Sequence, residues 1–255
     1  MGTVRTEHLN LTEFIAHAQE QPYDEDAYLT SFFGGTFEDA LAAFKTGLLV
    51  NTDQFELDAD RLFNALAEDT RIDRKYAVAG DFFDVGRIAE GHPEVWIKRK
   101  RTPVKPIINI LAQIGFTGDI RTHQIYNRGV AIAALVKYLG NAGYPLNLQL
   151  LINFHRNRYG TYTAYIDFPS DPLDIDLLNY ALTSRMFYRR LGFSFNNWLR
   201  RTSAAIDYGQ CYLHTVPQDT LYFPCIEGYE YDTLDDARAR ITALLDTQLV
   251  THQTE

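Results

Sequence analysis

The stretch from residue 107 to residue 154 constrains the fold of this chain more than any other. It begins with a continuous apolar run of strand length, Ile107–Leu111, and ends with a second one, Leu146–Phe154. Between them lies an amphipathic segment, residues 122–139, whose apolar positions recur at helical spacing: Ile125, Ile132, Val136 and Leu139. Strand, helix and strand in this order predict a βαβ unit with two neighbouring parallel strands and a right-handed crossover. Sheets built from such units are covered by helices on both faces.

The rest of the chain continues this α/β pattern. Residues 161–167 are rich in Tyr and Thr and predict a strand that forms a hairpin with the one before it. Residues 171–190 predict a helix with acidic residues in its first turn and basic residues in its last. Residues 220–225 predict a further strand, and Thr233 with Asp236 opens a last helix through Leu245. The predicted fold class is α/β, a Rossmann-like sheet flanked by helices.

The first part of the chain is predicted to be mainly helical. Helical patterns occupy residues 10–20, 36–47 and 55–68, and the second is the best marked, because Thr36 and Asp39 match a capping box. Residues 80–97 hold three glycines and a proline, which predict short turns or a small helix.

The pattern changes near residue 100, and this change divides the chain into three predicted parts. Residues 1–97 form an α-rich N-terminal region that packs on the main domain. Residues 98–106 form a basic linker, which its two prolines make extended. Residues 107–255 form the α/β domain.

The linker carries the one strong positive cluster of an acidic chain. The formal net charge is −9, which argues against a protein that coats nucleic acid through its overall field. The cluster consists of Lys98, Arg99, Lys100, Arg101 and Lys105. It is equally consistent with contacts to the phosphates of DNA or RNA and with a solvated linker that pairs with acidic groups of this chain or of a neighbouring copy. Four further side chains would extend a nucleic-acid surface if they lie near it: Trp96, Arg121, Arg156 and Arg158.

The sequence predicts no metal centre, no cofactor and no membrane segment. Cys211 and Cys225 lie far apart without a CxxC or His-rich spacing, so we expect reduced thiols and no structural zinc. No segment approaches the roughly 18 continuous apolar residues of a membrane span. These features are typical of a cytoplasmic protein.

Polar residues gather where the two strands of the βαβ unit end, which is where open α/β sheets bind ligands. They are Gln113, Thr117, Asp119 and His123 after the first strand, and His155, Arg156 and Arg158 after the second. Asp119 and His123 could act as an acid and a base, and the N-terminus of the following helix could hold an anion. In the alternative interpretation, Thr117 and Asp119 cap that helix and the other groups are solvated. The segment GFTGDIR lacks the spacing of a phosphate-binding loop, so nucleotide binding is not predicted.

Four ordered segments resemble an uncharacterised protein family of tailed bacteriophages and related mobile elements. They are TFEDALAAFKTGL, AGDFFDVGRIAEGHPEVW, NRGVAIAALVKYLGNAGY and DPLDIDLLNYALTSRMFYRRLGF. The resemblance covers residues 31 to 195 and implies an origin in a phage or mobile element. It implies no activity, because the family has none established.

A weaker resemblance is to von Willebrand factor A-like domains, in which a strand ends in Asp-x-Ser-x-Ser and an amphipathic helix follows. This resemblance implies a von Willebrand A-like sheet. The corresponding segment here is LAQIGFTGD, where Ala112 or Gln113 replaces the aspartate and Gly115 and Thr117 replace the serines. Because a hard cation needs oxygen ligands at these positions, metal-dependent adhesion is not expected.

Three functions follow as hypotheses. The first is a non-enzymatic binding or assembly protein that joins protein partners or copies of itself, with or without DNA or RNA. It is favoured by the sixteen Tyr and sixteen Phe residues and by the single basic cluster. The second is a metal-dependent hydrolase or nuclease, which requires four side chains to converge at the strand ends: Asp119, His123, His155 and Asp167. The third is a structural subunit of a virion.

Overall fold

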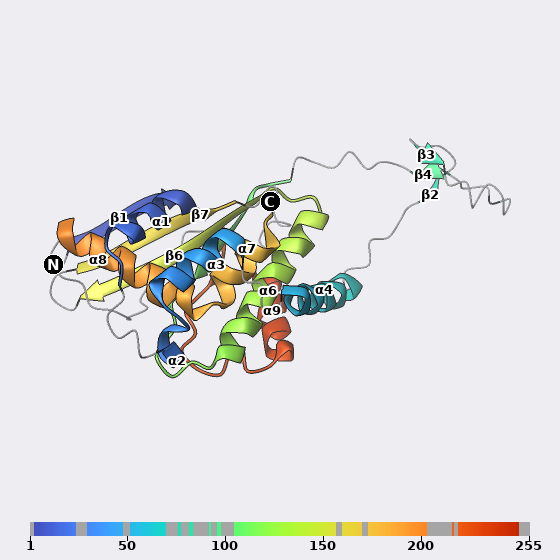
Figure 1. Ribbon diagram of the computed structural model, residues 1–255. Helices are drawn as coiled ribbons and strands as arrows, with labels where there is room; N and C mark the ends of the chain where they lie inside the picture. Colours follow the sequence, from blue (N-terminus) through green and yellow to red (C-terminus); the bar gives the residue numbers. More distant parts are fainter. Residues whose placement is uncertain are drawn as a thin grey trace.

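A five-stranded mixed sheet forms the centre of the protein, as the computed structural model in Figure 1 shows. The model describes residues 3–23, 30–47, 52–69, 76–77, 82–83, 92, 96–97, 105–156, 160–169, 173–202, 216 and 219–249. The strand order is β1 (Thr3–Asn10), β7 (Gly160–Phe168), β6 (Leu146–Arg156), β5 (Ile108–Gln113) and β8 (Thr220–Phe223). Only the β6–β7 pair is antiparallel among these neighbours. The predicted α/β class is therefore confirmed.

The βαβ unit has the predicted topology. β5 and β6 are parallel neighbours, with Ile110 opposite Leu148, and α6 (Thr122–Asn141) connects them. β6 then forms the predicted hairpin with β7. A second, small sheet has the order β2 (Tyr76–Ala77), β4 (Trp96–Ile97) and β3 (Phe82–Phe83).

The helices before α6 are α1 (Leu11–Glu20), α2 (Thr30–Phe33), α3 (Phe37–Thr46) and α4 (Thr52–Asp69). Those after it are α7 (Ile175–Thr183), the π-helix η1 (Phe187–Gly192), α8 (Phe193–Thr202) and α9 (Leu234–Leu249). The predicted capping box of α3 is present, with Thr36 and Asp39 each accepting from the other's backbone N–H. Thr233 and Asp236 open α9 in the same way.

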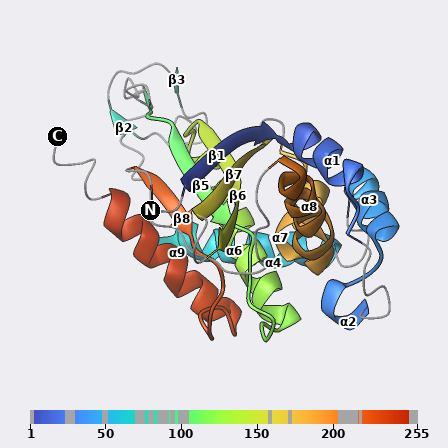
Figure 2. The ribbon, with the colours of Figure 1, turned by 90° about the vertical axis from the view of Figure 1, so that its left-hand side faces the viewer.

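The described helices pack on one face of the sheet. One row across the five strands, Leu9, Ile166, Leu150, Ala112 and Phe223, faces the hydrophobic core that these helices complete. The next row, Asn10, Asp167, Gln149, Leu111 and Tyr222, lies on the opposite face. Figure 2 shows the helices gathered on one side of the strands. The expectation of helices on both faces is therefore not met within the described residues, and we call the second face the helix-free face.

α6 is the central helix of the core. Every residue from Val130 to Val136 is buried, because α4, α7 and α9 pack around α6 on the side away from the sheet. A helix that is apolar all round is typical of such an interior position. Asp58 of α4 is buried at this contact and accepts a hydrogen bond from the hydroxyl of Tyr126 at 2.9 Å.

Two elements differ from the sequence prediction. Besides its helices, the N-terminal region contributes an edge strand, β1, to the main sheet, which the sequence analysis does not predict. Asn10, the last residue of β1, caps α1 in a capping box with Glu13.

The predicted helix over residues 171–190 is interrupted at Ser184, whose backbone is extended and whose hydroxyl accepts from the N–H of Met186. Such side-chain bonds compete with the helical ladder.

The predicted linker lies mostly outside the described residues, which resume at Lys105. The ammonium group of Lys105 donates to the carbonyl of Ala142, just after α6, and lies 4.2 Å from the centre of the Tyr144 ring. This member of the basic cluster is therefore engaged within the fold.

Two glycines of α6 give a matched test of the helix packing. A Cβ at Gly129 would lie 2.6 Å from Cγ2 of Thr183 and 3.3 Å from Cβ of Leu182, whereas one at Gly140 would meet its nearest neighbour at 4.0 Å. We expect Gly129→Ala to lower the free energy of unfolding by about 1–3 kcal/mol through overpacking. Gly140→Ala should raise it by up to about 1 kcal/mol, because Ala is the better helix former. Urea unfolding of both variants measures this, and equal effects would contradict the close α6–α7 contact.

Candidate functional site

The space outside the carboxyl ends of β5 and β8 is occupied by the side chain of Arg128. Its Nη1 donates to the carbonyl of Gln113 at 2.8 Å and to that of Pro224 at 3.2 Å. Arg128 comes from the second turn of α6 and is 1 % exposed. A guanidinium has five donors in a fixed fork, so one side chain can join two strand ends. Here a protein side chain fills the position at which other α/β sheets hold a ligand.

Two further guanidinium groups hold the loop that follows β5. Arg189 of η1 donates to the carbonyl of Thr117 at 3.1 Å and to that of Phe32 at 2.6 Å. Its guanidinium carbon also lies 3.7 Å from the ring centre of Phe32 and 4.6 Å from that of Phe116. Arg185 donates to the carbonyl of Ile120 at 2.9 Å. The loop is thus fixed by its carbonyl groups.

Burial, together with the nearby charge of Arg185, lowers the pKa of Arg189 to about 10. The group therefore remains a cation at neutral pH. Its charge is balanced by carbonyl dipoles and aromatic ring faces, which attract a guanidinium. The arrangement is a structural clamp, and it does not provide a base or a nucleophile.

Asp119 is exposed and is bound by a neighbour in its own loop. The hydroxyl of Thr117 donates to Oδ1 of Asp119 at 2.5 Å. This hydrogen bond, followed by one from the backbone of Asp119, lowers the pKa of the carboxyl group. Asp119 is thus ionised at neutral pH and is unsuited to donate a proton. It also does not cap α6, because the N-cap residue is Arg121, whose N–H donates to Oε1 of Gln124 at 3.0 Å.

His123 faces the loop before α9 and does not pair with Asp119. Its Nε2 lies 3.4 Å from Oδ1 of Asp232, and both side chains are partly exposed. The neighbouring side chains of α6 bind the same loop, since Gln124 donates to the carbonyl of Gly228 at 2.7 Å and Asn127 donates to that of Tyr231 at 2.9 Å. The first turns of α6 therefore hold this loop against the sheet.

The four residues of the hydrolase hypothesis are not brought together where they are described. Asp167 of β7 lies opposite Gln149 of β6, whose side-chain amide donates to its carboxylate at 2.7 Å. Because β6 lies between β7 and β5, Asp167 is two strand spacings, about 9–10 Å, from β5. His155 and Arg156 are the last two residues of β6, and their side chains lie outside the described set. Arg158 lies outside the described residues. Within the described part of the chain, no group of three or more His, Cys, Asp or Glu side chains could hold a metal ion. The geometry gives the hydrolase hypothesis no support.

The helix-free face carries a set of polar side chains of which sequence analysis singles out only Gln113 and Asp167. Nδ2 of Asn147 donates to Oδ1 of Asn109 at 3.1 Å. The hydroxyl of Tyr222 donates to Oε1 of Gln113 at 2.5 Å. On β1 and β7, the rings of His8 and Tyr165 stack with centres 4.9 Å apart. The alternation of polar residues in LNLQLLINF at residues 146–154 was the available signal, because alternate residues of a strand share a face.

Two side chains on this face have unfilled hydrogen-bonding capacity although they are buried. Asn153 is 3 % exposed, and both of its polar side-chain atoms are without a hydrogen-bond partner in the described structure. Nε2 of Gln113, on the neighbouring strand, is in the same situation. Each such group costs about 1–3 kcal/mol of desolvation. Unsatisfied amides of this kind require an explanation other than stability.

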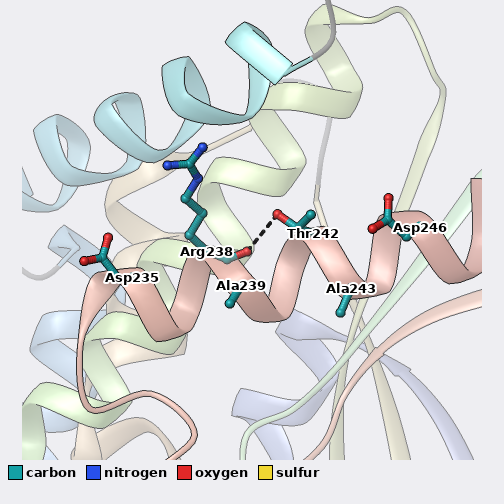
Figure 3. Close-up of a pocket in the computed structure, with 6 residues that line it drawn as sticks. All are labelled: Asp235, Arg238, Ala239, Thr242, Ala243 and Asp246. Atoms are coloured by element: carbon teal, nitrogen blue, oxygen red, sulfur yellow. Dashed lines mark hydrogen bonds between the residues drawn. The ribbon is translucent and has the colours of Figure 1, made fainter.

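A groove lies along α9 (Figure 3). Its volume is about 580 Å³, and it is lined by Asp235, Arg238, Ala239, Thr242, Ala243 and Asp246. Arg238 donates to the carbonyl of Ala65 in α4 at 3.5 Å, and Thr242 donates to the carbonyl of Arg238 at 3.1 Å. The first contact joins α9 to α4, and the second lies within α9. Together they form no catalytic arrangement.

Comparison with known proteins gives one result. A family described as a domain of unknown function, DUF7192, matches residues 2–252. The chain belongs to the DUF7192 family. The match extends from β1 to α9, so the DUF7192 domain includes both the N-terminal helices and the central sheet. No curated protein and no solved structure matches the chain. In this DUF7192 chain, none of the described helices has the length and apolar character needed to cross a membrane.

The role of Arg128 as a clamp can be tested by Arg128→Met, which retains much of the side-chain volume. The buried carbonyl of Gln113 and the partly buried carbonyl of Pro224 lose their donor, each at a cost of about 1–3 kcal/mol. We therefore expect the free energy of unfolding to fall by at least about 2 kcal/mol in a urea titration. Lys45→Met, which removes an exposed cation of α3, is the control and should change little. An equally small change for Arg128→Met would show that the strand ends do not depend on the guanidinium.

Proposed function

We propose that this DUF7192 chain is a non-enzymatic binding protein that joins protein partners, including copies of itself, and contacts nucleic acid through its basic run. The observation that carries the proposal is the helix-free face. It spans all five strands of the main sheet and carries hydrogen-bonding side chains from each of them, of which those toward β1 and β7, such as Thr6, His8 and Asp167, are exposed. Sheets with parallel strands are usually covered on both faces, so a face of this kind is suited to contact another molecule.

The chemistry of the helix-free face favours a protein partner. Its described side chains are mainly amides, hydroxyls and aromatic rings, and they include one carboxylate, that of Asp167. Cross-strand bonds such as Gln149 to Asp167 hold these groups in place, which lowers the entropy that a partner must remove on binding. The exposed side chains of Thr6, His8 and Asp167 add donors and acceptors that a peptide group can meet.

Nucleic acid would be contacted by a different part of the chain. Lys98, Arg99, Lys100 and Arg101 lie outside the described residues, and Lys105 is bound to Ala142. The proposal therefore rests on the first four side chains for phosphate contacts. Such contacts are independent of sequence and weaken with salt.

The protein-binding part predicts where crosslinks form. A photoactivatable residue is placed at position 149, on the helix-free face, in cells that express the protein. It should form adducts with the same proteins each time the experiment is repeated. Position 57 is the control, because Leu57 is 53 % exposed on α4, away from this face. Mass spectrometry of the adducts measures the difference. Adducts of equal yield and identity at both positions would contradict a role for the helix-free face.

The nucleic-acid part predicts a loss of retention on charge reversal. Changing Lys98, Arg99, Lys100 and Arg101 to Glu should abolish retention of DNA and RNA in a salt-titrated mobility-shift assay. In a plot of the logarithm of the binding constant against the logarithm of the salt concentration, each lost phosphate contact makes the slope less steep by about 0.7–0.9. Reversal of three exposed cations elsewhere, Lys45, Arg61 and Arg240, makes most of the same change in net charge and should leave retention intact. If the four-residue variant binds like the parent at every salt concentration, this part of the proposal is wrong.

A further inference from the structure

The groove along α9 has a floor of small side chains. All of the residues that line it belong to α9, and three of them, Ala239, Thr242 and Ala243, form the stretch between its two ends. Both alanines are exposed, and the hydroxyl of Thr242 is satisfied by a carbonyl of the same helix. Side chains as short as these let a second helix approach to about 8 Å between axes, the close end of the usual range.

Two carboxylates mark the ends of this floor. Asp235 and Asp246 are eleven residues apart, so they lie on one face of α9 and about 16 Å apart along its axis. Both are exposed, and neither forms a hydrogen bond or an ion pair with any residue that the structure describes. Arg238, the cation of the lining set, is directed toward α4, where it donates to the carbonyl of Ala65 at 3.5 Å (Figure 3). The groove is therefore negative at both ends.

We propose that this groove docks a helix of another protein, one that carries two basic side chains eleven residues apart with small residues between them. Residues at this spacing share a face of a helix, so each basic side chain meets one carboxylate whichever way the partner helix runs. Charge complementarity at both ends selects such a partner and fixes its register. The groove lies on the helix side of the sheet, opposite the helix-free face. The inference therefore goes beyond the proposed function and does not depend on it.

The same charges disfavour α9 of a second copy as the occupant. In the antiparallel pair that superposes the two floors, Asp235 would stand beside the partner's Asp246. In the parallel pair, each carboxylate would stand beside its own equivalent. Like charges placed together across an interface are unfavourable, so the occupant that fits the groove is a helix of opposite charge.

Two synthetic helices test the proposal by fluorescence anisotropy with the full chain. The first is an alanine-rich peptide with two lysines eleven residues apart. The second has the same composition with the lysines nine residues apart, which places them on opposite faces of the helix. We expect the first peptide to bind at least about threefold more tightly, because only this peptide can meet both carboxylates. The difference should disappear at high salt, which screens exposed ion pairs.

Substitutions in the protein locate the contact. Asp235→Asn and Asp246→Asn should each weaken binding of the first peptide by about two- to fivefold, because each removes one exposed ion pair. Ala239→Gln should weaken it without a change of charge, because the longer side chain raises the floor. Asp53→Asn is the control, since it removes an exposed carboxylate at the start of α4, twelve residues before the contact of Ala65 with α9. Circular dichroism establishes that each variant is folded.

Three results overturn the inference. They are equal affinity of the two peptides, no binding of the first peptide at the highest concentration measured, and a variant with both aspartates changed to asparagine that binds like the parent. These measurements involve neither position 149 nor the basic run. Failure of the inference is therefore separable from failure of the proposed function.

Discussion

Contacts from guanidinium groups to backbone carbonyls hold this structure together at the point where its separate segments meet. Arg128 joins the ends of β5 and β8, and Arg189 joins the loop after β5 to the segment before α3. Arg190 continues the pattern, donating to the carbonyls of Gly35 at 2.7 Å and Tyr23 at 3.1 Å. Burying a charge is costly unless donors and acceptors are matched. These arginines meet that condition with carbonyl groups and with the rings that flank them.

The π-helix explains how Arg189 and Arg190, which are neighbours in sequence, point in different directions. η1 follows the break at Ser184, and its wider turn places Arg189 toward the loop after β5 and Arg190 toward the N-terminal segment. π-Helical turns are rare and often accompany function. Here the turn has an architectural role, because it fastens residues near 23 and 35 to the centre of the fold.

The sequence predicts this fold where the signal is local. The apolar runs around Ile110 and Leu150 and the capping box at Thr36 each depend on neighbours within a few residues, and each is confirmed. β1 is polar and carries two charges, so its identity as a strand comes from pairing with β7, more than 150 residues later. The same limit applies to the site. The sequence suggests Asp119, four residues away, as the partner of His123, but the structure places Asp232 beside it, and only the folding of the loop after β8 brings Asp232 near.

The position of the arginines bears on what the domain can do. Basic residues such as Arg189 and Arg190 at the end of a helical pattern favour an exposed last turn by the dipole rule, yet both are fully buried. Because Arg128 occupies the strand ends and Arg189 holds the loop after β5, the surface that binds ligands in related architectures is part of the core. Under the proposed function, interaction takes place on the outer part of the helix-free face, where Thr6, His8 and Asp167 are exposed. A domain whose usual pocket is filled by its own arginine side chain is, in the proposed function, one that binds through its surface.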